Sequence, residues 1–305
     1  MAVYVNTNYS ALQGQRYLSN VQNSLTTTYQ RLSSGMRINS AKDDAAGLQI
    51  ADRLTSQING LNQGNRNASD GIALAQTIES GMDEIAGMLQ KVRTLAVQAT
   101  NGTNTAEDRG ALAKEASSLV AEMQRIAKQT TYGGKTVLAG GTTTSIYSKA
   151  QNASNGGKMT LQVGSNKGDT ISFDVSSFVF SVMANGFSAG FWDDADGLKD
   201  SSKGTAVKFS TAAAAADLIK SMDGIIARVD AQRADLGAIQ NRLESSIRNQ
   251  SNVAANEADA RSRIRDADFA EESANLSQQS IIQQAAASML RQANTRPQLG
   301  LSLLG

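Results

Sequence analysis

The sequence predicts a mainly α-helical protein in which long arms from both chain ends pack as a coiled coil or helical bundle and flank a small β-rich central insert. Both arms carry apolar residues at alternating spacings of three and four, which is the seam of long packed helices. Every arginine lies in residues 16–125 or 228–296, whereas six of the seven phenylalanines and the single tryptophan lie in residues 173–209. Because the composition changes so sharply, we expect the arms and the middle to be distinct units.

The first arm begins with a helix that stops at a polar break. Its apolar residues, Leu18, Val21, Leu25 and Leu32, fall on one helical face. Ser33, Ser34 and Gly35 then interrupt the pattern, and apolar spacing resumes at Leu48. Asp43 and Asp44 stand where a new helix would begin, and their charge suits the dipole of a helix start.

Three longer seams follow. They run from Ile58 to Ala96, from Leu112 to Thr130 after a turn at Asn101–Gly102, and from Met222 to Val253 in the second arm. Several seam positions are polar where leucine would pack better: Asn65, Gln232, Ser246 and Gln250. Polar residues at such positions fix the register of packed helices at the expense of stability.

The chain ends with another short apolar series: Phe269, Leu276, Ile281, Ile282, Met289 and Leu290. Isolated helices shorter than about 12–15 residues are marginal, and longer ones still need a packed face. Both terminal series therefore need a partner that covers them.

The middle predicts a β-hairpin with one buried face. Met159, Leu161 and Val163 alternate with polar residues, as do Ile171, Phe173 and Val175, and GSNKGD forms the turn between them. The following Gly-, Ser- and aromatic-rich stretch, residues 176–204, is expected to form a small surface unit. Its DDADG motif does not fit a calcium loop, because Trp192 occupies the first ligand position and Lys203 the position of the bidentate glutamate.

Composition excludes several classes of function. The chain has no histidine and no cysteine, which removes disulfides, Cys/His zinc sites, Ser-His-Asp triads and HExxH metalloprotease sites. Its 29 basic and 28 acidic side chains nearly cancel, which argues against nucleic-acid binding through bulk charge. We expect no enzyme, cofactor or metal site.

The ends carry no conventional targeting signal. The N-terminus, MAVYVNTNYSALQGQRYLSN, lacks the basic start and apolar run of a secretory signal peptide. No apolar stretch approaches the roughly 18 residues of a membrane span, so we expect no membrane insertion. By these signals alone the chain would be cytoplasmic.

Two long stretches resemble a known family. RLSSGMRINSAKDDAAGLQIADRLTSQINGLNQGNRNASDGIALAQTIE, which starts at Arg31, closely resembles the N-terminal conserved region of bacterial flagellin. SRIRDADFAEESANLSQQSIIQQAAASMLRQANTRPQLGLSLLG, at the C-terminus, resembles its C-terminal conserved region. The resemblance covers about three-quarters of the chain, while residues 140–205 match no family pattern beyond the hairpin.

The resemblance implies a two-layer subunit. In flagellins the two chain ends form a helical pair that lines the channel of the filament, and a spoke matching Arg31–Asp44 leads to an outer bundle. The implied segments are an inner helix and spoke (1–42), two halves of the outer bundle (43–139 and 205–262), a hairpin with a variable surface region (140–204), and a C-terminal inner helix (263–305). Neighbouring copies would supply partners for the terminal helices and the polar seam.

The function implied is structural: self-polymerisation into the filament that drives swimming. Nine apolar residues of the inner helices are expected to carry self-assembly: Leu18, Val21, Leu25, Leu32, Leu276, Ile281, Ile282, Met289 and Leu290. Four polar residues are expected to make contacts at the layer junction: Arg31, Arg37, Asp43 and Asp44.

The family also implies a location and partners. Flagellins are exported unfolded through the flagellar type III apparatus, so the expected location reverses to secreted, in the extracellular filament. Expected partners are other copies of the chain, an export chaperone at the C-terminal segment, and hook-associated and cap proteins. Flagellins recognised by Toll-like receptor 5 carry a patch whose pattern matches Gln90, Lys91, Val92, Arg93, Leu95 and Glu115. The pattern has arginine at Lys91 and an acidic residue at Thr94, so recognition is expected to be weakened.

Two alternatives stay open. A hook–filament junction protein shares flagellin-like ends but is a few-copy adaptor, and the near-continuous match through Ala41–Glu79 favours flagellin. Some flagellins carry an enzymatic insert. Here the absence of histidine removes a metalloprotease, and an insert of about 65 residues is small for another enzyme.

Overall fold

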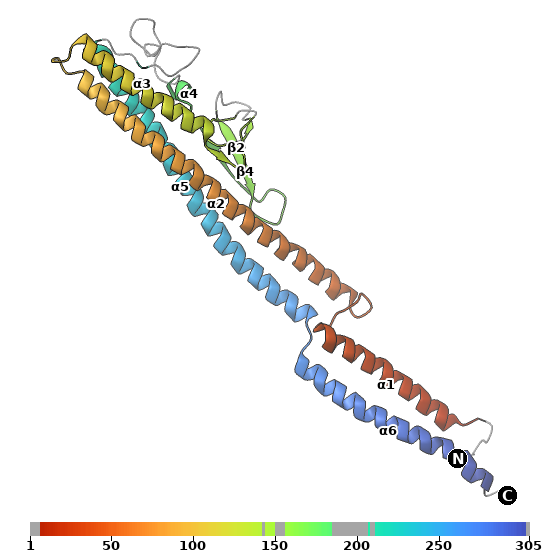
Figure 1. The fold of residues 1–305 in the computed structure, drawn as a ribbon. Helices are drawn as coiled ribbons and strands as arrows, with labels where there is room; N and C mark the ends of the chain where they lie inside the picture. Colours follow the sequence, from red (N-terminus) through yellow and green to blue (C-terminus); the bar gives the residue numbers. More distant parts are fainter. Residues whose placement is uncertain (1–6, 142–143, 150–155, 185–206, 208–210, 303–305) are drawn as a thin grey trace. The chain divides into compact units, whose positions relative to one another are not determined.

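A computed structural model describes residues 7–141, 144–149, 156–184, 207 and 211–302. The chain packs as two compact units. We call residues 1–59 with 253–305 the terminal unit, and residues 60–252 the central unit. The predicted fold class is confirmed: long helices from both ends of the chain flank a small set of strands (Figure 1).

The central unit is built on long helices. It contains most of α2 (Ala45–Ala99), all of α3 (Ala106–Gln129) and most of α5 (Ala212–Arg265). The apolar seams of α2 and α5 are buried as predicted. The fully buried side chains include Ile78, Met82 and Ile85 on α2, and Met222 and Ile225 on α5. Helix α3 begins with a capping box, in which Thr105 and Asp108 bond each other's backbone N–H. Local signals and periodicity thus agree along these helices.

Short strands fill the middle of the chain. Strands β1 (Thr131–Tyr132) and β2 (Lys135–Thr136) form an antiparallel pair. Strands β3 (Ser148–Lys149), β4 (Gly157–Gln162) and β5 (Thr170–Val175) form an antiparallel sheet in that order. Met159 pairs with Phe173 and Leu161 with Ile171, which is the hairpin that the alternating pattern predicted.

The expectation of a surface unit after the hairpin is wrong for its first residues. Phe178, Phe180 and Met183 are buried in the core of the central unit, and Phe180 lies in the short helix α4 (Phe180–Ala184). Large apolar side chains are stabilised by burial whatever the Gly and Ser content of the sequence around them. The acidic motif at 193–197 lies outside the described residues.

The hairpin lies directly against the backbone of α2. A Cβ at Gly64 would fall 2.0 Å from the Val163 carbonyl oxygen, and one at Gly71 would fall 2.3 Å from Leu161 Cδ1. On α5, the Gln232 side chain accepts from Ser176 N at 3.2 Å and donates to the Asp174 carbonyl oxygen at 3.0 Å. The polar seam residue Gln232 therefore has its partners within the chain, and the expectation that neighbouring copies supply them is wrong here.

The same substitution at two glycines of α2 should have opposite effects. Gly64→Ala should lower the free energy of unfolding by about 1–3 kcal/mol, because the new methyl group meets backbone that cannot rotate away. Gly87 meets nothing within 4 Å, so Gly87→Ala should raise the free energy of unfolding by about 0.5–1 kcal/mol through helix propensity alone. Urea unfolding of both variants measures the difference, and equal effects would contradict the close packing of the hairpin.

The terminal unit pairs the two ends of the chain. Helices α1 (Tyr9–Ser34) and α6 (Phe269–Ser302) lie side by side (Figure 1). Asn8 caps α1 by accepting from Ala11 N at 3.1 Å. The helix ends at Gly35, whose φ of 70° is left-handed and whose N–H donates to the Arg31 carbonyl oxygen. Glycine adopts this conformation without strain, which is why the polar break begins there.

Candidate self-assembly surface

Apolar contact between α1 and α6 is sparse. Val21 and Leu25 of α1 and Ala286 of α6 are their only buried apolar residues among those that the structure describes. Within the described part of the chain, the residues of the hydrophobic core cluster all lie in the central unit, between Ala68 and Leu243. The two helices therefore bury little apolar surface against each other.

Polar contacts join α1 to α6 at intervals. Arg31 Nη1 lies 2.9 Å from Glu272 Oε1, and the Glu272 side chain is only 8% exposed. Near the other end of α1, Asn8 Nδ2 donates to the Ala293 carbonyl oxygen at 2.8 Å. Because hydrogen bonds and ion pairs depend on direction, these contacts fix the register of the pair more than its stability.

The terminal unit leaves large apolar side chains in solvent. Ten large hydrophobic residues are exposed in the described chain, and nine of them belong to this unit; only Val97 belongs to the central unit. The nine are Tyr9, Leu12, Tyr17, Tyr29, Ile50, Val253, Phe269, Ile281 and Met289. Exposed apolar surface concentrated in one part of a protein marks an interaction site.

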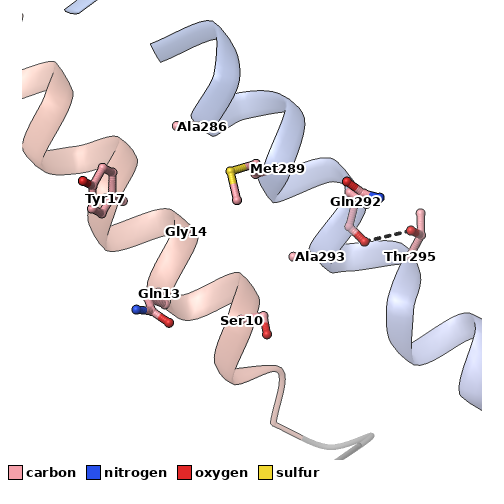
Figure 2. Close-up of a pocket in the computed structure, with 9 residues that line it drawn as sticks. All are labelled: Ser10, Gln13, Gly14, Tyr17, Ala286, Met289, Gln292, Ala293 and Thr295. Carbon is pink, nitrogen blue, oxygen red and sulfur yellow. Dashed lines mark hydrogen bonds between the residues drawn. The ribbon is translucent and has the colours of Figure 1, made fainter. Parts of the chain in front are cut away.

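A groove of about 1010 Å³ opens between α1 and α6 (Figure 2). Gly14 and Tyr17 line it from α1, and Ala286, Met289 and Ala293 line it from α6. The remaining lining residues are polar and uncharged: Ser10, Gln13, Gln292 and Thr295. Figure 2 shows Tyr17 and Met289 on opposite sides of the space, and the two residues are 63% and 70% exposed.

The predicted self-assembly residues fall into three classes of burial. Val21 and Leu25 are buried within the chain, whereas Ile281 and Met289 are exposed. The other five are half-buried: Leu18, Leu32, Leu276, Ile282 and Leu290. The predicted self-assembly residues therefore do not share one environment: some are buried in the terminal unit, and others are exposed to solvent.

The connector that follows α1 (residues 35–44) is hydrogen-bonded to the last turn of α5 and to the connector that precedes α6 (residues 266–268). Arg37 N donates to the Arg265 carbonyl oxygen at 2.7 Å, and Ala267 N donates to the Gly35 carbonyl oxygen at 3.0 Å. The Arg37 side chain adds a bond to the Ile264 carbonyl oxygen at 2.7 Å. The structure thus places Arg31 and Arg37 where the two ends of the chain meet.

The two predicted aspartates organise the start of α2. Asp44 Oδ1 accepts from Gly47 N at 2.9 Å, which caps the helix. Asp43 Oδ2 accepts from Ser40 N at 2.9 Å and from Asn39 N at 3.1 Å. These backbone bonds, with the Ser40 hydroxyl, hold the pKa of Asp43 below its ordinary value of 3.8, because they favour the charged carboxylate.

The lowered pKa of Asp43 predicts a pH dependence. Its stabilising contribution should be complete above pH 3.8 and should be lost as the pH falls through the lowered folded-state pKa. Asp43→Asn should therefore reduce the melting temperature at pH 7, and the difference from the unchanged chain should close only below pH 3.8. Scanning calorimetry of assembled protein measures this, with Asp52→Asn, an exposed carboxylate of α2, as the control. A gap that stays constant to pH 2 would contradict it.

Sequence reasoning missed two acidic residues in this region. Glu272 is the buried partner of Arg31, and Asp268 Oδ1 accepts from Ala270 N at 2.8 Å at the start of α6. The spacing of an aspartate just before an apolar helical series, with glutamates in its first turn, is a helix-start signal that could have identified Asp268. The burial of Glu272 has no such signal.

The residues of the predicted receptor patch differ in their exposure to solvent. Val92 is fully buried in the core of the central unit, so its inclusion as a surface contact is wrong. Arg93 pairs with Asp223 on α5. Gln90, Lys91 and Glu115 are exposed, and Leu95 is half-buried.

The described residues contain neither a cluster of acidic side chains placed to hold a metal ion nor a helix long and apolar enough to span a membrane.

Comparison with known proteins decides the family. The model of the bacterial flagellin N-terminal helical region matches residues 5–143, and that of the C-terminal helical region matches residues 219–304. Flagellin B of Vibrio cholerae and polar flagellin C of Vibrio parahaemolyticus are each 35% identical to the chain, and each match covers all of both sequences. The chain belongs to the bacterial flagellin family. It is therefore a structural subunit that self-polymerises into the flagellar filament.

Solved flagellar structures are similar to this chain. The crystal structure of Bacillus cereus flagellin matches this chain with 25% sequence identity and a TM-score of 0.46. The match covers 63% of this chain and 94% of the other. A protein from Vibrio parahaemolyticus described as a flagellar hook-associated protein is 16% identical, covers 73% and 100%, and has a TM-score of 0.54. At that identity the second likeness shows a shared fold and says nothing of role.

Proposed function

We propose that the terminal unit binds neighbouring copies of the chain while the central unit supports its own fold. The observation that carries this division is the placement of exposed large apolar side chains: among the residues that the structure describes, nine of ten lie in the terminal unit. The central unit holds the whole core cluster and does not need another copy to bury it. Each large apolar side chain buried between copies would contribute about 1.5–3 kcal/mol.

In this proposal the segments form two layers. Residues 1–42 and 263–305 form the inner layer and 43–139 with 205–262 the outer bundle. Residues 140–204 hold the hairpin, which packs on that bundle together with Phe178, Phe180 and Met183. Val21 and Leu25 hold α1 against α6, and Ile281 and Met289 face other copies. Four polar residues fix the connector between the layers: Arg31, Arg37, Asp43 and Asp44. Arg31 bonds Glu272 on α6 and Arg37 bonds the Ile264 carbonyl in the last turn of α5, while the two aspartates bond the backbone of the connector and of the first turn of α2, and these bonds support the assignment.

The proposal includes a route and further partners. The chain is exported through the flagellar type III apparatus and assembled outside the cell, with an export chaperone on residues 263–305 before export and hook-associated and cap proteins at the filament ends. The exposed apolar residues of α6 support the chaperone contact, because such a surface needs cover before assembly.

Nucleated polymerisation tests the proposed function. Purified chain mixed with short sheared filament fragments should elongate them into filaments visible by electron microscopy. A chain that stayed monomeric at every concentration, or that capped the fragments in a few copies, would instead favour the hook–filament junction alternative. Abundance of the chain in filaments sheared from cells separates the same two outcomes.

Receptor recognition gives a separate prediction. Lys91 is exposed on α2, and lysine lacks the planar fork with which arginine binds or stacks in two directions. Recognition by Toll-like receptor 5 should therefore be weak but measurable, and Lys91→Arg should strengthen it in a reporter-cell assay. Lys128→Arg, at an exposed position of α3, is the matched control. A response to Lys91→Arg no greater than to the control would count against the patch.

A further inference from the structure

The groove between α1 and α6 sets conditions on what can fill it. None of the described residues that line it is charged, and Gly14, Ala286 and Ala293 leave space between the larger Tyr17 and Met289. A charged side chain buried there would have no oppositely charged partner among the described lining residues, and its burial would cost several kcal/mol. The groove therefore fits an apolar side chain of moderate size on an uncharged surface.

Among the terminal-unit residues whose exposure the structure describes, one exposed side chain meets these conditions. Ile281 is 67% exposed, and its neighbours one turn away on α6 are Ser277, Gln278, Gln284 and Ala285, all exposed and uncharged. It is a single branched aliphatic side chain on a face of small and polar residues.

The other exposed aliphatic side chains of this unit each have a charged residue one turn away. Leu12 precedes Arg16, Ile50 precedes Arg53, and Val253 precedes Glu257. Among the aromatic residues, Phe269 precedes Glu272, and the tyrosines carry a hydroxyl that needs a hydrogen-bond partner when buried. Met289 itself lines the groove.

Ile281 cannot reach the groove of its own chain. It precedes Met289 by eight residues on the same helix, which separates their Cα atoms by about 12 Å along the axis and rotates one from the other by about 80°. A projecting side chain and a recess at different places on one molecule make a heterologous contact, which repeats into an open helical polymer.

We propose that the groove between α1 and α6 of one subunit receives Ile281 of a neighbouring subunit in the filament. This inference rests on the proposed function, since it names the contact through which terminal units join. Met289 and Tyr17 would then be covered from the sides, and Ile281 would be buried against Gly14 and Ala286.

Disulfide trapping tests the contact, because the chain has no cysteine of its own. The double variant Ile281→Cys with Met289→Cys should polymerise under reducing conditions. Oxidation with copper phenanthroline should then yield covalent oligomers longer than dimers on a denaturing gel. The two cysteines of one chain are too far apart to bond to each other, since a disulfide needs Cα atoms within about 7 Å. Oxidation of unpolymerised chain should yield no ladder.

Control variants separate a specific contact between Ile281 and the groove from crosslinking of any two exposed thiols in the filament. Ser273→Cys with Met289→Cys, which places the first thiol at another exposed position of α6, should give no ladder. Should Met289→Cys prevent polymerisation, Ala293→Cys, also in the groove, pairs with Ile281→Cys in its place. Two results would overturn the contact: filaments that form normally but give no ladder with either groove cysteine, or a control that gives an equal ladder. Both results would leave the proposed function unaffected. Failure of the unchanged chain to polymerise would overturn the proposed function itself.

Discussion

A chain that lacks residues 277–305 should remain a soluble helical monomer with nearly unchanged cooperative unfolding, and it should not polymerise. The core cluster lies between Ala68 and Leu243, so the truncation removes none of it. Ordering backbone costs about 1–2 kcal/mol per residue, and α1 and α6 bury too few apolar side chains against each other to offset this. Neither helix therefore adds much to the stability of the free monomer.

The same truncation should abolish polymerisation, because every subunit loses most of α6. The lost part includes four of the predicted self-assembly residues: Ile281, Ile282, Met289 and Leu290. Circular dichroism, urea unfolding and seeded polymerisation measure the two effects on one preparation. Truncated chain that formed filaments of normal length, or that unfolded entirely, would show that the division between the two units is wrong. Removal of residues 303–305 alone is a control that retains all of α6.

Replacing Arg31 by methionine should raise the critical concentration for polymerisation about tenfold to hundredfold. The substitution leaves the Glu272 carboxylate, whose side chain is 8% exposed, without its cation. Removing one member of a buried ion pair costs about 3–5 kcal/mol, and the 32% exposure of the Arg31 side chain reduces that figure here. A loss of about 1.4–2.8 kcal/mol per subunit corresponds to the stated range.

A double variant separates charge from packing. Arg31→Met with Glu272→Leu removes both charges and should restore most of the lost affinity, since apolar replacement of a buried pair is often neutral. Arg16→Met, at an exposed position of α1, is the control and should change the critical concentration less than threefold. If the double variant polymerised no better than Arg31→Met, the loss would come from the shape of the arginine side chain and not from the unpaired carboxylate.

The helices and the hairpin were predictable because their patterns are local. Periods of three and four over forty residues indicate a long packed helix, and alternation on both sides of GSNKGD indicates a hairpin. The break at Gly35 was equally clear, since serine and glycine interrupt the pattern just before two aspartates. These features depend on neighbours in sequence, which sequence analysis can read.

What the sequence left undetermined depends on residues far apart in the chain. The burial of Phe178 and Phe180 could not be predicted, because a Gly- and Ser-rich context resembles a surface loop until the hairpin places it over the core. The partners of Gln232 are Asp174 and Ser176, about sixty residues earlier. A polar seam position gave no indication of whether its partner lay within the chain or in another copy.

The candidate surface shows the same limit. Nine apolar residues of α1 and α6 were identified by period alone, but the rotation of one helix against the other decides which face inward. Val21 and Leu25 are buried whereas Ile281 and Met289 are exposed, although all four belong to similar apolar series. Only the packed pair distinguishes residues that join the helices from residues left for a neighbour.

Hydrogen exchange, residue by residue, in the free monomer and in the filament tests most directly whether the terminal unit depends on other copies. Amides of α1 and α6 should exchange rapidly in the monomer and become strongly protected in the filament, because only neighbouring copies cover their exposed apolar side chains. Amides of α2, α3 and α5 within residues 60–252 should be protected in both states. Equal protection of α1 and α6 in monomer and filament would contradict the account.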